Sequence, residues 1–305
     1  MLKQIKKVIK EPKRAVFGAD QRGYLNLLPD KTYLKIMYKA NVGQKLNLTK
    51  PITFNEKLQW LKIYNRQPEY TQMVDKYEVK QYVAEKIGLE YIIPTYGVWD
   101  SFNEIDFNVL PNQFVLKCTH DSGGLVICRD KSVFDIDAAR KKINKSLKRN
   151  YFYNGREWPY KDLKPRIIAE KYMEDSSGDQ LMDYKFYCFN GKPEFLYLSH
   201  GLENHSTASI SFLTLNWKRA PFERSDYLPF KEIPPKPSNF KEMKLLAEKL
   251  SKGLPFLRVD LYEINGQLYF SELTFFPCSG HLPFKPMKYD REIGKLLKLP
   301  NETNI

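Results

Sequence analysis

Two acidic residues in an apolar stretch near the end of the chain are the first candidates for chemistry. Asp260 and Glu272 lie twelve residues apart in a predicted hairpin of two strands, 257–264 and 268–273. Carboxylates in such strands are costly to bury unless they are paired or bind a cation. Two carboxylates suit Mg²⁺, which takes few protein ligands and shares its other positions with phosphate and water. Arg258 alternates with Val259, which predicts that it lies on the same face as Asp260. Edge-strand salt bridges are the alternative interpretation.

The turn of this hairpin sets a geometric condition on the metal site. If Asn265-Gly266 is a strict two-residue turn, Asp260 faces Ser271, and the two carboxylates point to opposite sides of the sheet. To share a metal ion they must face each other, which requires one extra residue between them. We therefore predict a one-residue irregularity between 261 and 271, because bulges are common beside active sites.

A lysine followed by a glycine turn is the second candidate site. Lys117 ends a predicted strand, 114–117, and the turn Asp121-Ser122-Gly123-Gly124 leads into a second strand, 125–128. Backbone N–H groups next to glycine can approach phosphate oxygens, and a nearby lysine supplies the compensating charge. The pattern is not a P-loop, because the G-x-x-x-x-G-K-[ST] spacing is absent and a strand follows. A tight hairpin with an ordinary lysine is the alternative.

A strand end at 170–173 is the third candidate. The strand 166–170 runs into Glu170-Lys171-Tyr172-Met173. An exposed backbone there could read the edge of an adenine ring. Seen alone, the segment favours an ordinary strand end.

The elements that position these residues mix helices with antiparallel hairpins. Thr53 and Glu56 form a capping-box pattern, so a helix is predicted to start there. A second helix is predicted from Asp75 to Gly88, and Pro94 and Gly97 mark a loop. Further predictions are a helix capped by Asp135, a hairpin with Asn190-Gly191 as its turn, an irregular loop over 221–239, and a helix from Asn239 to Gly253. Hairpins outnumber βαβ units, so the predicted fold class is α+β.

Composition and charge exclude several classes of protein. The chain has 305 residues, 42% of them apolar, and a net charge of +13, which excludes a disordered chain and fits two domains or one large one. No apolar run reaches the roughly 18 residues of a membrane span, and no signal-peptide core follows Met1.

The positive charge is concentrated in two segments. Residues 1–14 carry six basic residues and one acidic residue, and residues 140–171 carry eleven basic and three acidic residues. The first segment could contact an anionic membrane surface, and the second could bind nucleic acid or an anionic substrate.

No cysteine pair has metal-ligand spacing, so Cys118, Cys128 and Cys188 are predicted to be free core thiols of a cytoplasmic protein.

The order of the candidate sites resembles that of ATP-grasp enzymes. More closely, residues from about 20 to 300 resemble the TupA-like ATP-grasp family of bacterial polysaccharide (capsule) and teichuronopeptide gene clusters. The stretches that carry this resemblance are ITFNEKLQWLK (52–62), DKYEVKQYV (75–83), FVLKCTHDSGG (114–124), IIAEKYMED (167–175), DYKFYCFNGKP (183–193) and RVDLYEINGQLYFSELTFFPCSG (258–280). The resemblance implies an ATP-grasp fold, with a nucleotide held between two α+β subdomains with antiparallel sheets and a mostly helical N-terminal region. It divides the chain into 1–70, the basic helical region; 71–112, a linking N-terminal subdomain; 113–185, the small ATP-grasp subdomain; and 186–305, the C-terminal subdomain with the metal hairpin.

The resemblance also implies roles for individual residues. ATP phosphates would be held by Lys76, with Lys80 as the competing choice, by Lys117, and by the loop of Ser122, Gly123 and Gly124. Glu170 and the Lys171–Tyr172 backbone would bind the edge of adenine. Asp183 would bind ribose, with Asp179 as the second choice. Asp260 and Glu272 would bind Mg²⁺, Arg258 would steady the transferring phosphoryl group, and Lys185 would reach phosphate. Thr274 stands where many members have an asparagine metal ligand, and its hydroxyl is a poorer ligand for a second metal ion. His120 and the loop Ser279-Gly280-His281 could face the substrate.

The implied reaction is an ATP- and Mg²⁺-dependent carboxylate–amine ligation that proceeds through an acyl phosphate. The acid could be a uronic acid of a glycan and the amine a small amine or amino acid, with no nucleic acid involved. A glycosyltransferase using Asp135-Ile136-Asp137, an ATP-grasp kinase, and a non-catalytic glycan-binding or nucleic-acid-binding module are the alternatives.

Overall fold

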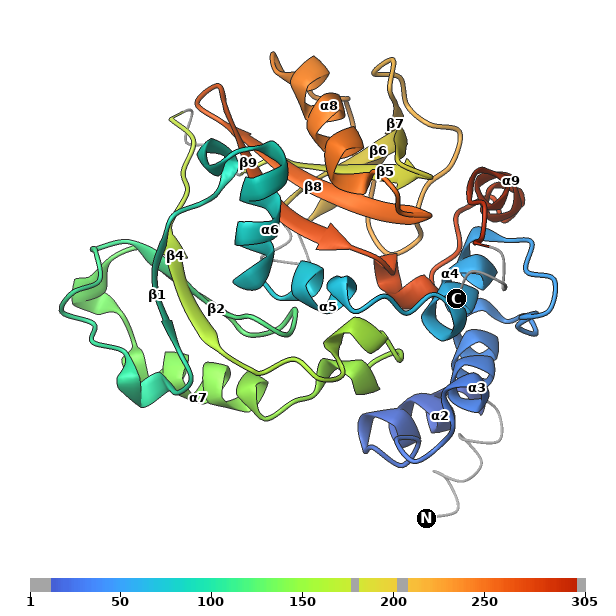
Figure 1. The fold of residues 1–305 in the computed structure, drawn as a ribbon, viewed down its shortest axis with the longest axis horizontal. Helices are drawn as coiled ribbons and strands as arrows, with labels where there is room; N and C mark the ends of the chain where they lie inside the picture. Colours follow the sequence, from blue (N-terminus) through green and yellow to red (C-terminus); the bar gives the residue numbers. More distant parts are fainter. Residues whose placement is uncertain (1–11, 177–180, 202–207, 301–305) are drawn as a thin grey trace. The chain divides into compact units, whose positions relative to one another are not determined.

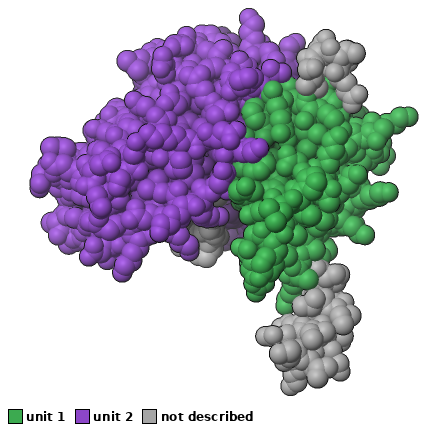
Figure 2. Space-filling view, turned by 60° about the horizontal axis from the view of Figure 1, so that its bottom comes forward, with its two compact units in different colours: residues 1–66, 152–158, 276–305 green, residues 67–151, 159–275 purple. Residues whose placement is uncertain are grey.

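A computed structural model describes residues 12–176, 181–201 and 208–300. The chain forms two compact units, one of residues 1–66, 152–158 and 276–305, and one of residues 67–151 and 159–275 (Figure 2). Most of the basic segment 1–14 lies outside the described residues, so the membrane contact predicted for it stays a prediction. The four-part division by sequence position also stays a prediction.

Helices make up the first unit. They are α2 (Pro12–Gln21), α3 (Asp30–Val42), α4 (Phe54–Tyr64) and α9 (Lys288–Leu296), with a short 3₁₀ segment, η6 (Pro277–Gly280). The predicted capping box is present, because Thr53 Oγ1 accepts from the Glu56 N–H while the Glu56 carboxylate accepts from the Thr53 N–H. Tyr33, Leu34 and Tyr38 on α3 are at most 1% exposed and form the centre of a small apolar core.

The second unit contains two sheets, the first with the strand order β1-β4-β2-β3 (Figure 1). Its strands are β1 (Thr95–Trp99), β2 (Phe114–Cys118), β3 (Leu125–Cys128) and β4 (Ile167–Lys171). Helix α7 (Ile136–Leu147) begins at its predicted cap Asp135 and packs Ala139 and Ile143 against one face of this sheet. Lys117, Val115 and Glu170 lie on the other face, since side chains alternate along a strand.

One local prediction for this sheet is wrong. Pro94 and Gly97 were expected to mark a loop, but β1 runs through Gly97. The register between β1 and β4 shifts between Thr95 and Gly97, so a bulge accommodates the glycine. A Cβ at Gly97 would meet the Trp99 ring at 2.4 Å, so a side chain there would displace this ring.

The second sheet has the order β7-β6-β5-β8-β9. Its strands are β5 (Asp183–Phe189), β6 (Lys192–His200), β7 (Ser209–Thr214), β8 (Phe256–Ile264) and β9 (Gln267–Thr274), and helix α8 (Phe240–Ser251) covers one face. The β5–β6 turn is the predicted Asn190-Gly191, with φ of 50° and 80°, which suits a type I′ turn. Helices α5 (Glu69–Val74) and α6 (Glu78–Ile87) complete this unit, together with short 3₁₀ segments at Leu89–Tyr91, Phe102–Glu104 and Lys131–Val133. Two further 3₁₀ segments, Tyr151–Tyr153 and Trp158–Tyr160, each include residues of both units.

All strand pairs among the described strands are antiparallel, so the structure has the predicted α+β class. Cys118, Cys128 and Cys188 are buried free thiols, as predicted, and Cys278 is exposed. Within the described ranges, none of the helices combines the length and apolar character needed to cross a membrane.

Candidate functional site

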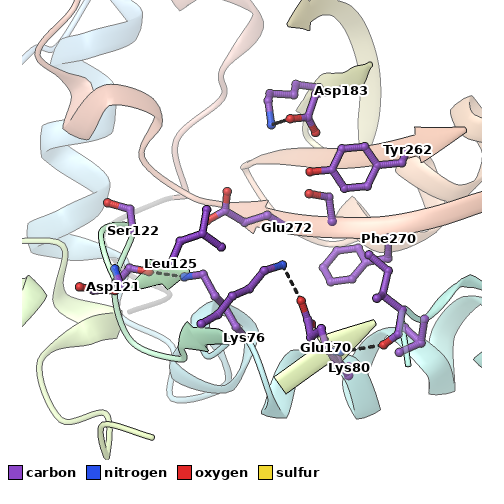
Figure 3. Close-up of a pocket in the computed structure, with 16 residues that line it drawn as sticks. Lys76, Lys80, Asp121, Ser122, Leu125, Glu170, Asp183, Tyr262, Phe270 and Glu272 are labelled. Atoms are coloured by element: carbon purple, nitrogen blue, oxygen red, sulfur yellow. Dashed lines mark hydrogen bonds and ion pairs between the residues drawn. The ribbon is translucent and has the colours of Figure 1, made fainter. Parts of the chain in front are cut away.

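A pocket in the second unit brings many of the predicted residues together (Figure 3). It has about 240 Å³ of open space. Both sheets and helix α6 contribute to its walls, so lysines from one side face carboxylates from the other. The residues that line it are Lys76, Lys80, Ile92, Ile93, Lys117, Asp121, Ser122, Gly124, Leu125, Glu170, Asp183, Lys185, Tyr262, Phe270, Ser271 and Glu272.

The predicted bulge is present in the β8–β9 hairpin. Pairing is regular from the Asn265-Gly266 turn up to Leu261 opposite Phe270, and then shifts so that Asp260 lies opposite Glu272. Ser271 is the extra residue. Residues directly opposite share a face, so both carboxylates lie on the same side of the sheet, with Arg258 and Thr274 opposite each other on that face. The condition for a shared metal ion is met.

Asp260 is the buried centre of a charged network. It is fully buried, and Arg258 donates to both of its oxygens at 2.7 Å while Lys185 Nζ donates to Oδ2 at 2.7 Å. Burial alone would raise the pKa of Asp260, but the Arg258 and Lys185 charges outweigh it and lower the pKa. Arg258 Nη2 also lies 3.4 Å from Glu272 Oε2, so one guanidinium joins the two carboxylates.

Lys185 connects this network to Asp183. Its ammonium lies 3.1 Å from Asp183 Oδ2, and β5 pairs with β8 so that Lys185 faces Asp260. Burial would lower the pKa of Lys185, but the Asp183 and Asp260 carboxylates raise it well above its usual value. Burial raises the pKa of Asp183, and its Oδ1 is buried with no hydrogen-bond partner in the described structure.

The donor set fits Mg²⁺ in part. Asp260 and Glu272 face each other, and Thr274 Oγ1 on the same face is buried without a hydrogen-bond partner among the described groups. An orphaned hydroxyl beside two carboxylates is what a third oxygen ligand would leave when the ion is absent. No cluster of three or more His, Cys, Asp or Glu side chains able to hold a metal occurs in the described part of the chain, so phosphate or water would have to supply further ligands.

On the opposite wall, Glu170 binds two lysines. Its side chain is 6% exposed, with Lys80 Nζ 2.5 Å from one oxygen and Lys117 Nζ 2.5 Å from the other. Burial would raise the pKa of Glu170, but the Lys117 and Lys80 charges together lower it. Burial lowers the pKa of Lys80, because one carboxylate does not offset the loss of water around its ammonium. Glu170 thus fixes the two ammonium groups beside each other.

The structure distinguishes Lys76 from its competitor Lys80. The Lys80 ammonium donates to the Ile93 carbonyl and Thr95 Oγ1 as well as pairing with Glu170, so its three protons are engaged. Lys76, just before α6, donates to the backbone carbonyl of Asp121 and points into the pocket (Figure 3). Lys76 therefore has more capacity to bind an incoming anion.

The glycine loop is held against helix α7. Asp121 accepts from the Gly124 N–H at 3.0 Å and from the Ser146 hydroxyl of α7. A Cβ at Gly124 would meet Cys118 Sγ at 2.5 Å, so this glycine permits close packing, whereas a Cβ at Gly123 would meet nothing closer than 3.7 Å. Ser122 is exposed, and its hydroxyl lies 3.4 Å from that of Tyr151.

Six predicted site residues do not line the pocket. Arg258, Asp260 and Thr274 share a sheet face with Glu272 but are not among the lining residues, and Gly123 lies in the glycine loop. Lys171 is exposed and its N–H donates to the Pro94 carbonyl, while the Tyr172 hydroxyl accepts from Arg129. Their predicted reading of adenine through the backbone stays a prediction. Asp179, the second choice for ribose, lies outside the described residues.

The two histidines predicted to face the substrate differ in exposure, and His120 is the buried one. His120 Nε2 lies 3.2 and 3.1 Å from the Ser146 and Arg149 carbonyls at the end of α7, which is a structural contact. His281, in the first unit, is partly exposed; burial of its ring, followed by the Lys62 charge, lowers its pKa well below its usual value. In that unit, Gln59 and Lys62 of α4 donate to the Ser279 carbonyl at 2.9 and 2.8 Å and hold the loop preceding His281.

The apolar residues that line the pocket were not predicted from the sequence. Ile92, Ile93, Tyr262 and Phe270 line the same space as the lysines. Tyr262 is two residues from Asp260 on β8, so strand alternation from Asp260 could have identified it. Ile92 and Ile93 lie in no strand or helix, and no periodicity marks them.

Comparison with known protein families identifies the family of this chain. The family model described as TupA-like ATPgrasp matches residues 56–298. The chain belongs to the TupA-like ATP-grasp family. Membership confirms the family and the ATP-grasp fold that the ordered motifs predicted, and the predicted class of ATP-grasp ligase agrees with it. The D-x-D alternative has a structural explanation, because the Asp135 carboxylate accepts from the Ala138 N–H as a helix cap.

Solved structures give more distant similarities, and no curated protein matches the chain significantly. D-Alanine–D-alanine ligase from Bacillus anthracis complexed with ATP is 16% identical, covers 67% of this chain and 55% of its own, and has a TM-score of 0.38. The chain thus spans little more than half of that ligase. D-Alanine–D-alanine ligase from Helicobacter pylori is 15% identical over 80% of this chain and 69% of its own, with a TM-score of 0.43. A RimK domain ATP-grasp protein from Sphaerobacter thermophilus is 11% identical over 77% and 70%, with a TM-score of 0.41. Similarities at this level carry no argument about the reaction.

Proposed function

We propose that this TupA-like ATP-grasp protein is an ATP- and Mg²⁺-dependent ligase that joins a carboxylate to an amine and forms ADP. One observation supports the proposal most strongly. Lys76 and Lys117 line the same pocket as Asp183 and Glu272, so candidate phosphate-binding cations border one space with a candidate ribose ligand and a candidate metal ligand. The family membership supports the same class of reaction.

The proposed nucleotide site uses both walls of the pocket. Lys117 and Lys76 bind phosphate oxygens, with Ser122, Gly123 and Gly124 covering them. Asp183 accepts from the ribose hydroxyls, and the base lies toward Ile92 and Phe270, with Glu170 and the Lys171–Tyr172 backbone at its edge. Glu170 then holds Lys117 in place, because its carboxylate pairs with that ammonium at 2.5 Å.

The proposed reaction has two displacement steps. A substrate carboxylate oxygen forms a bond to the γ-phosphorus while the bond to the ADP oxygen breaks, giving an acyl phosphate. The amine nitrogen then bonds to the carbonyl carbon, phosphate leaves with its bridging oxygen, and the amine loses a proton to solvent. Arg258 and Lys185 place positive charge where the phosphoryl oxygens gain negative charge, so catalysis is positioning and electrostatics without a protein nucleophile.

Asp260, Glu272 and Thr274 are the residues that would hold Mg²⁺. When bound there, the ion supplies further positive charge to the phosphate oxygens. Because Arg258 and Lys185 occupy both Asp260 oxygens in the described structure, the carboxylate has to accept an additional partner or exchange one of them.

The proposed acid is a uronic acid of a bacterial surface polysaccharide, and the amine is an amino acid or small amine. This finer assignment rests on the resemblance to the TupA-like family. The protein would act in the cytoplasm, where ATP is available.

The test is a product assay with Mg·ATP, a panel of uronic acids and a panel of amines. The proposal predicts ADP release that requires both an acid and an amine, together with the mass of an amide. Phosphorylated acid without amide would instead identify a kinase, and UDP released from a nucleotide sugar would identify a transferase. Absence of ATP binding, measured by calorimetry on the same preparation, would contradict the proposal whatever the substrate.

A further inference from the structure

Helix α7 carries a line of exposed basic side chains that the proposed reaction does not use. Lys141, Lys145 and Lys148 follow each other at intervals of four and three residues, so they lie on one side of the helix. Arg149 comes directly after Lys148, and all four are exposed. The opposite side, with Ala139 and Ile143, is buried against the first sheet. We call these four residues the α7 basic stripe.

No ion pair is described for any of the four stripe residues, and the carboxylates nearest to them lie at the two ends, Asp137 one turn before Lys141 and Asp121 at the glycine loop beside Arg149. The one ion pair described on this helix joins Arg140 to Asp137, and neither belongs to the stripe. Like charges one helical turn apart repel each other, so this line of lysines does not stabilise the helix. Four cations along one side of a helix, without a described ion pair to any of them, give this side a net positive potential that attracts polyanions.

The stripe ends beside the glycine loop of the pocket. The Ser146 hydroxyl on α7 donates to Asp121, and the His120 ring binds the Arg149 carbonyl at 3.1 Å. A Cβ at Gly123 would lie 3.8 Å from Arg149 Nη1, so the last cation of the stripe is next to the loop. A chain lying along the stripe would therefore be led toward the loop that covers the pocket.

Tyr151 adds an aromatic surface at the same end. Its hydroxyl lies 3.4 Å from that of Ser122, and its ring packs edge-on against Tyr160 at 4.9 Å between centroids. Tyr151 is half-buried in this arrangement. A ring fixed in this way can contact the apolar face of a sugar. Basic side chains followed by a fixed tyrosine suit an acidic glycan.

We propose that the α7 basic stripe docks a polyanionic glycan that presents its carboxylates to the pocket. This inference rests on the proposed function, because it names the polymeric form of the acid substrate. A polymer held along the stripe keeps its next carboxylate near the pocket at a raised effective concentration. Nucleic acid is the competing polyanion; the pocket adjoining the stripe favours the glycan, because the proposed reaction consumes a carboxylate.

The test compares two triple variants with equal loss of charge. The stripe variant, Lys141→Gln/Lys145→Gln/Lys148→Gln, removes three of the four stripe cations. The α8 variant, Lys241→Gln/Lys249→Gln/Lys252→Gln, removes three exposed lysines at or just beyond α8, in the same unit. Fluorescence anisotropy measures binding of a labelled oligogalacturonate, a single-stranded oligonucleotide of the same charge and a neutral oligosaccharide. We expect the stripe variant to bind oligogalacturonate at least about tenfold more weakly at low salt, with the α8 variant near the wild type.

Three results would overturn the proposal. They are wild-type binding of oligogalacturonate by the stripe variant, an equal loss in both variants, and tighter binding of the oligonucleotide than of oligogalacturonate by the wild-type protein. The last would assign the stripe to nucleic acid.

Turnover distinguishes this inference from the proposed ligase activity. With a monomeric uronic acid, the stripe variant should retain the kcat and KM of the wild type, while its KM for the polymer rises. A wild-type protein that binds oligogalacturonate through the stripe but ligates no acid would refute the ligase and leave the docking surface standing. A ligase whose KM for polymer is the same in wild type and stripe variant would refute the docking surface alone.

Discussion

Asp260 lies directly opposite Glu272 across the β8–β9 hairpin because Ser271 is inserted as a bulge between Phe270 and Glu272. Without that residue the two carboxylates would face opposite sides of the sheet. Arg258 contacts both carboxylates, so the three side chains form one cluster on the pocket side of the hairpin. The bulge is thus the local feature on which the proposed metal site depends.

Thr274 tests whether this cluster binds metal. Its hydroxyl is buried and orphaned among the described groups, and valine has nearly the same shape without the oxygen. If the hydroxyl is a ligand, Thr274→Val should raise the Mg²⁺ concentration needed for half-maximal ATP turnover by roughly tenfold, the effect of losing one interaction of 1–2 kcal/mol. The resistance of the variant to urea should be equal or greater, because no hydrogen bond is lost. An unchanged Mg²⁺ requirement would remove Thr274 from the site.

Lys117 should be required for nucleotide binding. Its side chain is 30% exposed and pairs with Glu170 beside the pocket. Lys117→Ala should weaken ATP binding by roughly tenfold or more, since a charge-assisted contact to phosphate is lost. Isothermal titration with Mg·ATP measures this, and Lys249→Ala on the exposed side of α8 is the control. Equal ATP affinity in wild type and Lys117→Ala would contradict the assignment.

Substitutions of Lys76 and Lys80 should affect different properties, ATP binding for Lys76 and the free energy of unfolding for Lys80. Lys80→Met removes a buried partner of Glu170 and should lower the free energy of unfolding by about 3 kcal/mol. Lys76→Met should leave unfolding nearly unchanged and weaken ATP binding. Urea unfolding and ATP titration of both variants measure the two effects. The opposite pattern would make Lys80 the phosphate ligand.

Asp290 predicts a pH dependence of stability in the first unit. Its carboxyl is fully buried and accepts from Asn55 at 2.5 Å, and burial raises its pKa from 3.8 to about 6. Between these values the folded state binds more protons than the unfolded state, so this group favours folding at low pH. That contribution is lost as the pH rises through 6, which lowers the free energy of unfolding by about 3 kcal/mol.

The Asp290→Asn variant isolates this term. Urea unfolding of wild type and variant at pH 4.5 and 7.5 gives the difference in their free energies at each pH. The wild type should lose stability relative to the variant as the pH rises. A difference that stays constant between the two pH values would show that Asp290 does not titrate in this range.

Local sequence patterns predicted much of the fold. The capping box at Thr53, the cap at Asp135 and the Asn-Gly turn at 190–191 fix their elements through contacts within a few residues. The strand β1 was missed for the converse reason. Glycine is typical of turns, and the bulge at Gly97 depends on pairing with the distant strand β4, where Ala169 lies opposite Gly97.

The residues of the site could be predicted from the sequence more readily than the side chains that each of them contacts. The position of the bulge followed from requiring two carboxylates on one face, a condition of chemistry and not of local sequence. The pairing of Glu170 with both Lys80 and Lys117 depends on how α6 packs beside β2 and β4, which no spacing along the chain reveals. The same applies to Lys185, which reaches Asp260 because β5 lies next to β8.

The most direct test of the central claim follows oxygen atoms through the reaction. The protein is incubated with Mg·ATP, amino acids and uronic acids whose carboxyl groups carry ¹⁸O, and the phosphate and amide are analysed by mass spectrometry. An acyl phosphate predicts one ¹⁸O in each phosphate released, with ADP and amide formed in equal amounts. ADP formed with unlabelled phosphate, or without amide, would contradict the account.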